Sequence, residues 1–77
     1  MKNTITFTTR QYVLSHMKAP RGWGMWAFEA SFGETDVEIW TPGSMTYAEG
    51  KKFARARALE IAQRESWTGT IEISAQP

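Results

Sequence analysis

A chain of 77 residues without cysteine has room for one small domain and excludes disulfides and thiolate metal sites. Nine Lys and Arg against eight Asp and Glu leave a formal charge of +1, which is too small for bulk attraction to a polyanion. No apolar run approaches the ~20 residues of a membrane span, and the first ten residues lack a signal-peptide apolar region. We therefore expect a cytoplasmic protein that does not contact membranes. The one compositional excess is the four tryptophans, which suit a core or an interface.

Residues 4–8 (TITFT) alternate strictly between polar and apolar side chains, which is typical of a half-buried strand. The phase then slips, because Tyr12 and Leu14 fall on the opposite face unless a bulge resets the register. We interpret residues 5–14 as one long strand, bulged near its middle. The alternative is a short helix capped at Thr9.

Two further strands are predicted in the next part of the chain. A turn at residues 18–22 (KAPRG) is followed by a strand over residues 25–32. A tight reverse loop at residues 33–35 leads to a strand over residues 36–41. The side chains expected to face the core are Trp26, Phe28, Ala30, Phe32, Val37 and Ile39, whereas Glu38 and Trp40 are expected to point outward.

The strongest helix signal lies in residues 46–65. Thr46 and Glu49 have the spacing of a capping box, so we expect the helix to begin at Tyr47. One stripe of this helix consists of Tyr47, Gly50, Ala54, Ala58 and Ile61. Its small residues let the helix lie close to a sheet. Gly50 costs about 1 kcal/mol relative to Ala, and close approach to a strand would explain why it is tolerated.

The last predicted strand covers residues 70–74, with Ile71 and Ile73 inward, and residues 1–3 and 75–77 are expected to fray. The element order is then β-β-β-α-β. We expect an antiparallel meander of three strands, a helix across one face, and a fourth strand parallel to the first or third. This is an α+β two-layer sandwich, one helix on a four-stranded, mostly antiparallel sheet, in a single domain of residues 1–77.

The residues that commonly carry chemistry do not form a pattern here. His16 is the only histidine, and no second metal ligand stands at a suitable spacing. Asp36 and Glu38 share one strand face, but neither a cleft nor a third group accompanies them. Gly22 and Gly24 are not followed by a strand–helix phosphate cradle. We expect no catalytic residue, no metal and no cofactor, and hence a protein that is not an enzyme.

Two surfaces remain as candidates for binding a partner. The first is a glycine-bearing loop, residues 18–26, in which tryptophans are interleaved with basic residues. This composition suits either a protein hot spot or stacking on unpaired bases. The second is the start of the predicted helix, where Lys51, Lys52 and Arg55 lie close to the positive end of the helix dipole. Positive charge is unfavourable there, which indicates a role in binding. Acidic side chains elsewhere make the charge two-sided and favour a protein partner. The predicted partner-binding residues are Lys18, Arg21, Trp23, Trp40, Lys51, Lys52 and Arg55.

Residues 46–73 (TYAEGKKFARARALEIAQRESWTGTIEI) resemble a pattern of small phage and mobile-element accessory proteins. In these, an alanine-spaced helix that starts with aromatic-x-Glu leads through a glycine into a short terminal strand. Several anti-CRISPR proteins of this size are similar in being a small sheet with one helix. The resemblance covers about a third of the chain and transfers no site residues. It implies a stoichiometric binder that blocks a host complex without catalysis.

Three hypotheses follow for the function. The first is a non-enzymatic protein-binding module, an accessory factor or inhibitor from a mobile element, with Arg21, Trp23 and Trp40 as anchors. The second is a small nucleic-acid-binding protein that uses Lys18, Arg21, Trp23 and the basic helix start. The third is a self-associating protein, such as a homodimer, joined through an unpaired strand edge or the second sheet face.

Overall fold

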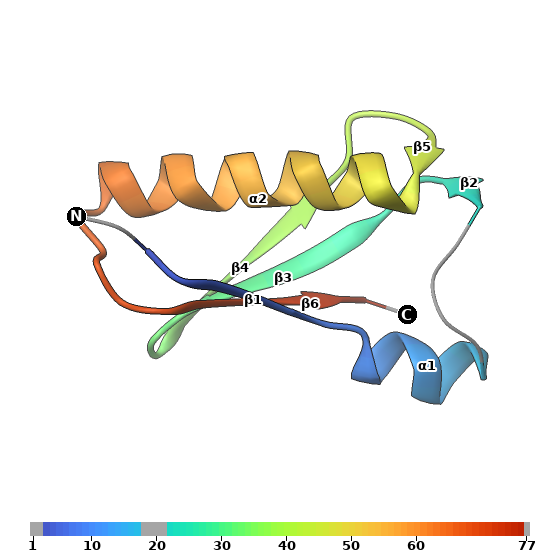
Figure 1. Ribbon diagram of the computed structural model, residues 1–77, viewed down its shortest axis with the longest axis horizontal. Coiled ribbons are helices and arrows are strands. Elements are labelled where there is room, and N and C mark those ends of the chain that lie inside the picture. The colour runs from blue at the N-terminus through green and yellow to red at the C-terminus, as the bar shows by residue number, and fades with distance from the viewer. Residues whose placement is uncertain (1–2, 18–21, 77) are drawn as a thin grey trace.

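The computed structural model describes residues 3–17 and 22–76 and shows an α+β fold (Figure 1). Helix α2 lies across one face of a four-stranded sheet, and a second, two-stranded sheet sits beside the start of that helix. The elements in chain order are β1 (Ile5–Thr8), α1 (Arg10–His16), β2 (Trp23–Gly24), β3 (Ala27–Phe32), β4 (Thr35–Trp40), β5 (Met45–Thr46), α2 (Tyr47–Arg64) and β6 (Ile71–Ala75). The predicted fold class is confirmed, with α1 and the small sheet added to it.

The strand order of the main sheet is β1-β6-β3-β4. β6 runs parallel to β1 and antiparallel to β3, while β3 and β4 form a hairpin. The predicted meander of the first three strands is therefore wrong, because β6 lies between β1 and β3. Both inward side chains of β6, Ile71 and Ile73, are completely buried. A central position buries this last strand better than an edge would.

The predicted long strand over residues 5–14 is also wrong, since β1 ends at Thr8 and α1 begins at Arg10. The slip in phase marked a change from strand to helix and not a bulge. Thr9 occupies the N-cap position, as in the alternative, but its side chain makes no capping bond. The helix ends where Met17 adopts a left-handed φ of 61° and its N–H donates to the Val13 carbonyl at 2.7 Å.

Helix α2 begins at Tyr47 with the predicted capping box. The Glu49 N–H donates to the Thr46 hydroxyl at 3.2 Å, and the Thr46 N–H donates to the Glu49 carboxylate at 3.0 Å. The buried residues of the helix are Gly50, Ala54, Ala58, Ile61 and Ala62, which confirms most of the predicted stripe. A Cβ on Gly50 would lie 3.1 Å from Cδ1 of Trp26. The close neighbour that favours glycine at this position is therefore an indole ring and not the expected strand backbone.

The predicted inward faces of the strands are confirmed, and together with α2 they form the core. At the turn between β3 and β4, Gly33 has a φ of 69°, as the first central position of a type II′ hairpin requires. The Trp67 ring fills the space between this turn and Gly69, since a Cβ on either glycine would lie within 3 Å of it (2.8 and 2.9 Å). This indole closes the end of the core near the end of α2.

The predicted fraying does not extend to the described ends of the chain. The Asn3 side chain donates to the carbonyls of Trp67 and Gly69 at 2.9 and 3.1 Å. Ala75 is buried within β6, and the Gln76 N–H donates to the Ala27 carbonyl at 2.9 Å. Residues 1, 2 and 77 lie outside the described residues.

The sheet face that α2 leaves uncovered, here called the open face, is polar. Strand register places its side chains in rows that cross the sheet, so that Thr6, Glu72, Ser31 and Asp36 lie in one row, and Thr8, Ser74, Glu29 and Glu38 in the next. Four carboxylates, two in each of these neighbouring rows, therefore share this face, and we call all four together the acidic row: Glu29, Asp36, Glu38 and Glu72.

Candidate partner-binding surface

Three large apolar side chains project into solvent at one end of the molecule. Trp23, Met25 and Trp40 are 72, 60 and 57% exposed, respectively. They line a shared depression of about 280 Å³, whose other walls include Tyr12 and His16 of α1. We call Trp23, Met25 and Trp40 the end patch. Single exposed apolar residues are ordinary, but three large ones around one depression are a candidate interaction site.

The end patch is held by the buried Trp26 beneath it. The Trp26 indole N–H donates to the Met45 carbonyl at 2.8 Å, and its backbone N–H donates to the Thr41 hydroxyl at 2.9 Å. The Thr41 hydroxyl in turn donates to the Gly43 carbonyl at 3.0 Å. Trp26 thereby ties together β5 and the end of β4. Because Trp23 pairs with Thr46 of β5, the segments that carry both exposed indoles belong to one bonded framework.

Helix α1 extends this apolar surface. The Tyr12 ring stacks on His16 with centroids 4.1 Å apart and lies 5.8 Å from Trp26. Leu14 is 70% exposed, and Met17 at the helix end is also exposed. No residue of α1 is buried, although the helix contacts β6. α1 and β2 lie at the same end of the molecule (Figure 1), so this end carries the large apolar side chains that are exposed among the described residues.

The acidic row continues directly from the end patch along the open face. The Trp40 indole N–H donates to the Glu38 carboxylate at 2.9 Å. Glu29 stands opposite Glu38 on the neighbouring strand, and the Ser31 hydroxyl donates to the Asp36 carboxylate opposite it. The exposed indole of Trp40 thus borders a negatively charged surface.

The basic start of α2 forms a different surface. The Lys51 ammonium lies over the Phe7 ring, 5.0 Å from its centroid, and 5.8 Å from the centroid of Tyr47. Exposed Lys52 and Arg55 line a depression of about 410 Å³ together with these rings. Phe7 points to the face of the sheet that α2 covers, whereas Trp40 points to the open face.

The structure thus divides the residues predicted to bind a partner. It brings Trp23 and Trp40 together in the end patch and places Lys51, Lys52 and Arg55 on the separate surface at the start of α2. Lys18 and Arg21 lie outside the described residues.

Sequence reasoning missed three contributors to the binding surface, namely Tyr12, Met25 and Glu72. Met25 directly precedes Trp26, a residue expected to face the core, so alternation along the chain already carried a signal of its exposure. Glu72 joins the acidic row only through the pairing of β6 with β3, for which the local sequence carries no signal.

Burial raises the pKa of the Tyr47 hydroxyl above its ordinary value of 10.0. In the described part of the chain, no cluster of three or more His, Asp or Glu side chains could hold a metal ion. Neither α1 nor α2 combines the length and apolar character needed to cross a bilayer.

Comparison with known proteins yielded no matching family model, no similar curated protein and no similar solved structure.

Proposed function

We propose that this chain is a non-enzymatic binding protein whose end patch anchors it to a partner protein. The observation that carries the proposal is the pair of exposed indoles, Trp23 and Trp40, on a framework hydrogen-bonded through Trp26. Tryptophan is enriched among the residues that contribute most to protein–protein binding. A framework that already fixes the segments carrying the indoles reduces the ordering cost of association.

The acidic row defines the chemistry of the partner. Its carboxylates border Trp40, so the matching surface has an apolar pocket flanked by Lys or Arg side chains. The charges steer encounter and orientation, while burial of the indoles supplies most of the affinity. In the form that the resemblance to anti-CRISPR proteins implies, the partner is a host protein complex, and this chain blocks it by occupying its surface.

A nucleic-acid partner is less well supported by the geometry. Phosphates would be repelled by the carboxylates next to Trp40. At the start of α2, where cations are available, Lys51 already lies over the Phe7 ring and leaves that ring no free face on the same side for a base.

The test compares two double variants as baits in an extract of the cells that make this protein. Trp23→Ala/Trp40→Ala removes the anchors, and Lys52→Ala/Arg55→Ala removes exposed cations from the other surface. Proteins retained by each bait are quantified by mass spectrometry, and each candidate partner is then purified and titrated against the same variants. Far-UV circular dichroism and thermal unfolding check that both variants are folded.

The expected result is a purified partner whose affinity falls at least about 100-fold with the tryptophan variant, the loss of two hot-spot residues. The cation variant should retain affinity within about threefold. Equal affinities of the wild type and the tryptophan variant would overturn the proposal. Loss with the cation variant alone would transfer the site to the start of α2.

A further inference from the structure

Strand β4 forms one edge of the main sheet, and its outer backbone groups are unpaired among the described residues. Two hydrogen bonds establish which groups these are. The Thr41 N–H donates to the Trp26 carbonyl, so residues of β4 an even number of positions from Thr41 bond to β3. The N–H and C=O groups of Asp36, Glu38 and Trp40 therefore point away from the sheet.

The pairing of β3 with β6 supports the same assignment. The Gln76 N–H donates to the Ala27 carbonyl, which places the backbone groups of Ala27 on the β6 side of β3. Ala27 lies opposite Trp40 in the β3–β4 register, so this pair exchanges no backbone bond. The outer edge of β4 consequently offers three residues whose donors and acceptors are ready to pair with another strand.

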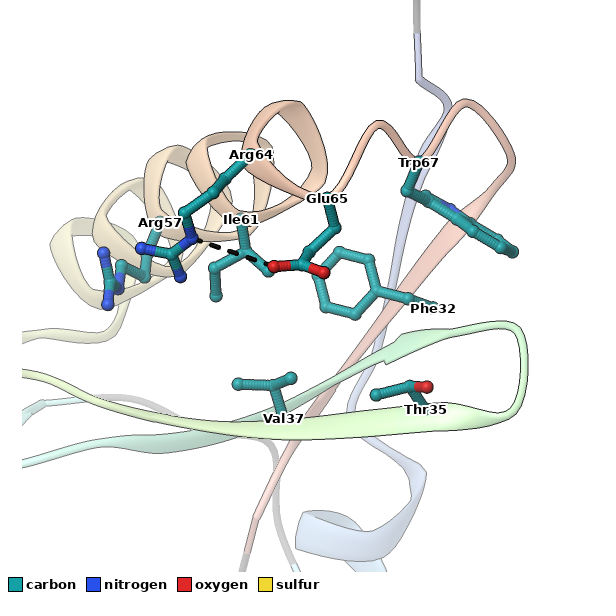
Figure 2. A pocket seen from close by; sticks show the side chains of 8 residues that line it. All are labelled: Phe32, Thr35, Val37, Arg57, Ile61, Arg64, Glu65 and Trp67. Atoms are coloured by element: carbon teal, nitrogen blue, oxygen red, sulfur yellow. Dashed lines mark ion pairs between the residues drawn. The ribbon is translucent and has the colours of Figure 1, made fainter.

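A groove runs beside this edge, between β4 and the second half of α2 (Figure 2). Its volume is about 390 Å³, and its apolar lining includes Phe32, Val37 and Ile61. Figure 2 shows the guanidinium groups of Arg57 and Arg64 on the α2 side, across from Val37 on β4. Arg57 pairs with Glu60, and Arg64 approaches Glu65 at 4.0 Å, both at exposed positions where such pairs exchange readily.

We propose that the edge of β4 and this groove bind an extended peptide segment of a partner protein, which adds to the sheet as a fifth strand. Its backbone pairs with Asp36, Glu38 and Trp40, and its alternate side chains enter the groove. This site adjoins the end patch and shares Trp40 with it: the peptide pairs with the Trp40 backbone, whereas the end patch presents the Trp40 indole.

The charges on the two sides of β4 define the peptide further. Side chains of the added strand that point to the open face lie next to Asp36 and Glu38, where Lys or Arg is favoured. Side chains that point into the groove meet an apolar floor and the two guanidinium groups, where Val, Ile or a single Glu is favoured. The expected ligand therefore alternates basic residues with apolar or acidic ones.

A second copy of this chain fits the edge poorly. Antiparallel pairing of two β4 strands would place Asp36 and Glu38 of one copy beside the same carboxylates of the other on a shared open face. Like charges on adjacent strands destabilise a sheet. Charge complementarity thus favours a foreign basic strand over self-association.

The probe is a capped synthetic peptide in which lysine alternates with valine, with one valine replaced by glutamate. A second peptide carries glutamate at every lysine position. Amide hydrogen exchange is followed by NMR in the full chain. In the free protein, the amides of Val37 and Ile39 should be protected by their bonds to β3, and those of Asp36, Glu38 and Trp40 should exchange quickly. The lysine peptide should slow exchange at these three amides at least about tenfold.

Three variants separate strand addition from simple charge attraction. Glu38→Pro removes an outward N–H but no bond to β3, and it should abolish binding, whereas Glu38→Ala should weaken binding only several-fold. Asp36→Lys/Glu38→Lys should reverse the preference in favour of the glutamate peptide. Retained protection at Val37 and Ile39 verifies that each variant is folded.

Unchanged exchange at Asp36, Glu38 and Trp40 with saturating lysine peptide would overturn the proposal. So would equal binding of both peptides by the wild type and the double-lysine variant. Protection of the same amides that rises with protein concentration, without peptide, would instead identify a second copy as the occupant.

Discussion

Glu29 and Glu38 lie directly opposite each other on β3 and β4, with both side chains on the open face of the sheet. Pairs of like charge in this position destabilise a sheet. Glu38 is partly compensated by the indole N–H of Trp40, whereas Glu29 faces Ser74 on its other side. The arrangement lowers stability locally and creates the negative surface on which the proposed partner chemistry depends.

Replacing one of these carboxylates should therefore stabilise the protein. Glu29→Gln is expected to raise the free energy of unfolding by about 0.2–1 kcal/mol, because it removes the repulsion across the β3–β4 pair. Urea unfolding at low ionic strength measures the gain, which should shrink as salt is added. The matched control is Glu34→Gln in the hairpin turn, outside the acidic row, for which no comparable gain is expected. A Glu29→Gln protein no more stable than the wild type would contradict this account.

The contact between Gly50 and Trp26 leads to a second prediction. Gly50→Ala should gain about 1 kcal/mol of helix propensity, but its Cβ would lie 3.1 Å from an indole that is buried and hydrogen-bonded to Met45. Because the ring cannot move freely, we expect a net loss of about 1 kcal/mol in the free energy of unfolding. Chemical denaturation of Gly50→Ala, Trp26→Phe and the double variant tests this. The two losses should be less than additive, since the smaller ring leaves room for the methyl group. A more stable Gly50→Ala protein would show that the indole adapts.

The capping box provides a third prediction. Thr46→Ala removes the hydroxyl that accepts from the Glu49 N–H and should cost about 1 kcal/mol. Thr46→Ser keeps the acceptor and should stay within about 0.5 kcal/mol of the wild type. Thermal or urea unfolding of both variants measures the difference. If the two variants lose the same stability, the contribution of Thr46 comes from its methyl group, which both variants lack, and not from the cap.

Tyr47 should make stability depend on alkaline pH. Burial raises the pKa of its hydroxyl in the folded state above 10.0, so in the unfolded chain this group loses its proton at a lower pH. The unfolded state then binds fewer protons, and the free energy of unfolding falls as the pH rises above about 10. Below that range both states are protonated and Tyr47 contributes no slope.

Tyr47→Phe should remove part of this alkaline decline without changing the slope near neutral pH. Urea unfolding of both proteins between neutral pH and about pH 11 measures the two slopes. Parallel curves throughout would show that the hydroxyl ionises equally easily in the folded and unfolded states.

The elements predicted correctly depend on contacts within a few residues. The start of α2 depends on Thr46 and Glu49, three positions apart, and the inward faces of β3 and β4 follow from alternation. The segment of α1 was misread because it is seven residues long, too short for strand and helix periods to be told apart. The candidate site was predictable only where such local patterns apply. The exposure of Trp40, for example, follows from the alternation of side chains along β4.

The α+β class, the capped helix and the side chains that face the core follow from local sequence patterns, because propensity, capping and side-chain periodicity act over a few residues. Long-range packing places β6 between β1 and β3 and thereby brings Glu72 next to the carboxylates of β3 and β4. It alone also placed Trp23 and Trp40 around one depression over Trp26. These relations join residues far apart in the chain. They depend on which strand buries most apolar surface when it takes the central position of the sheet.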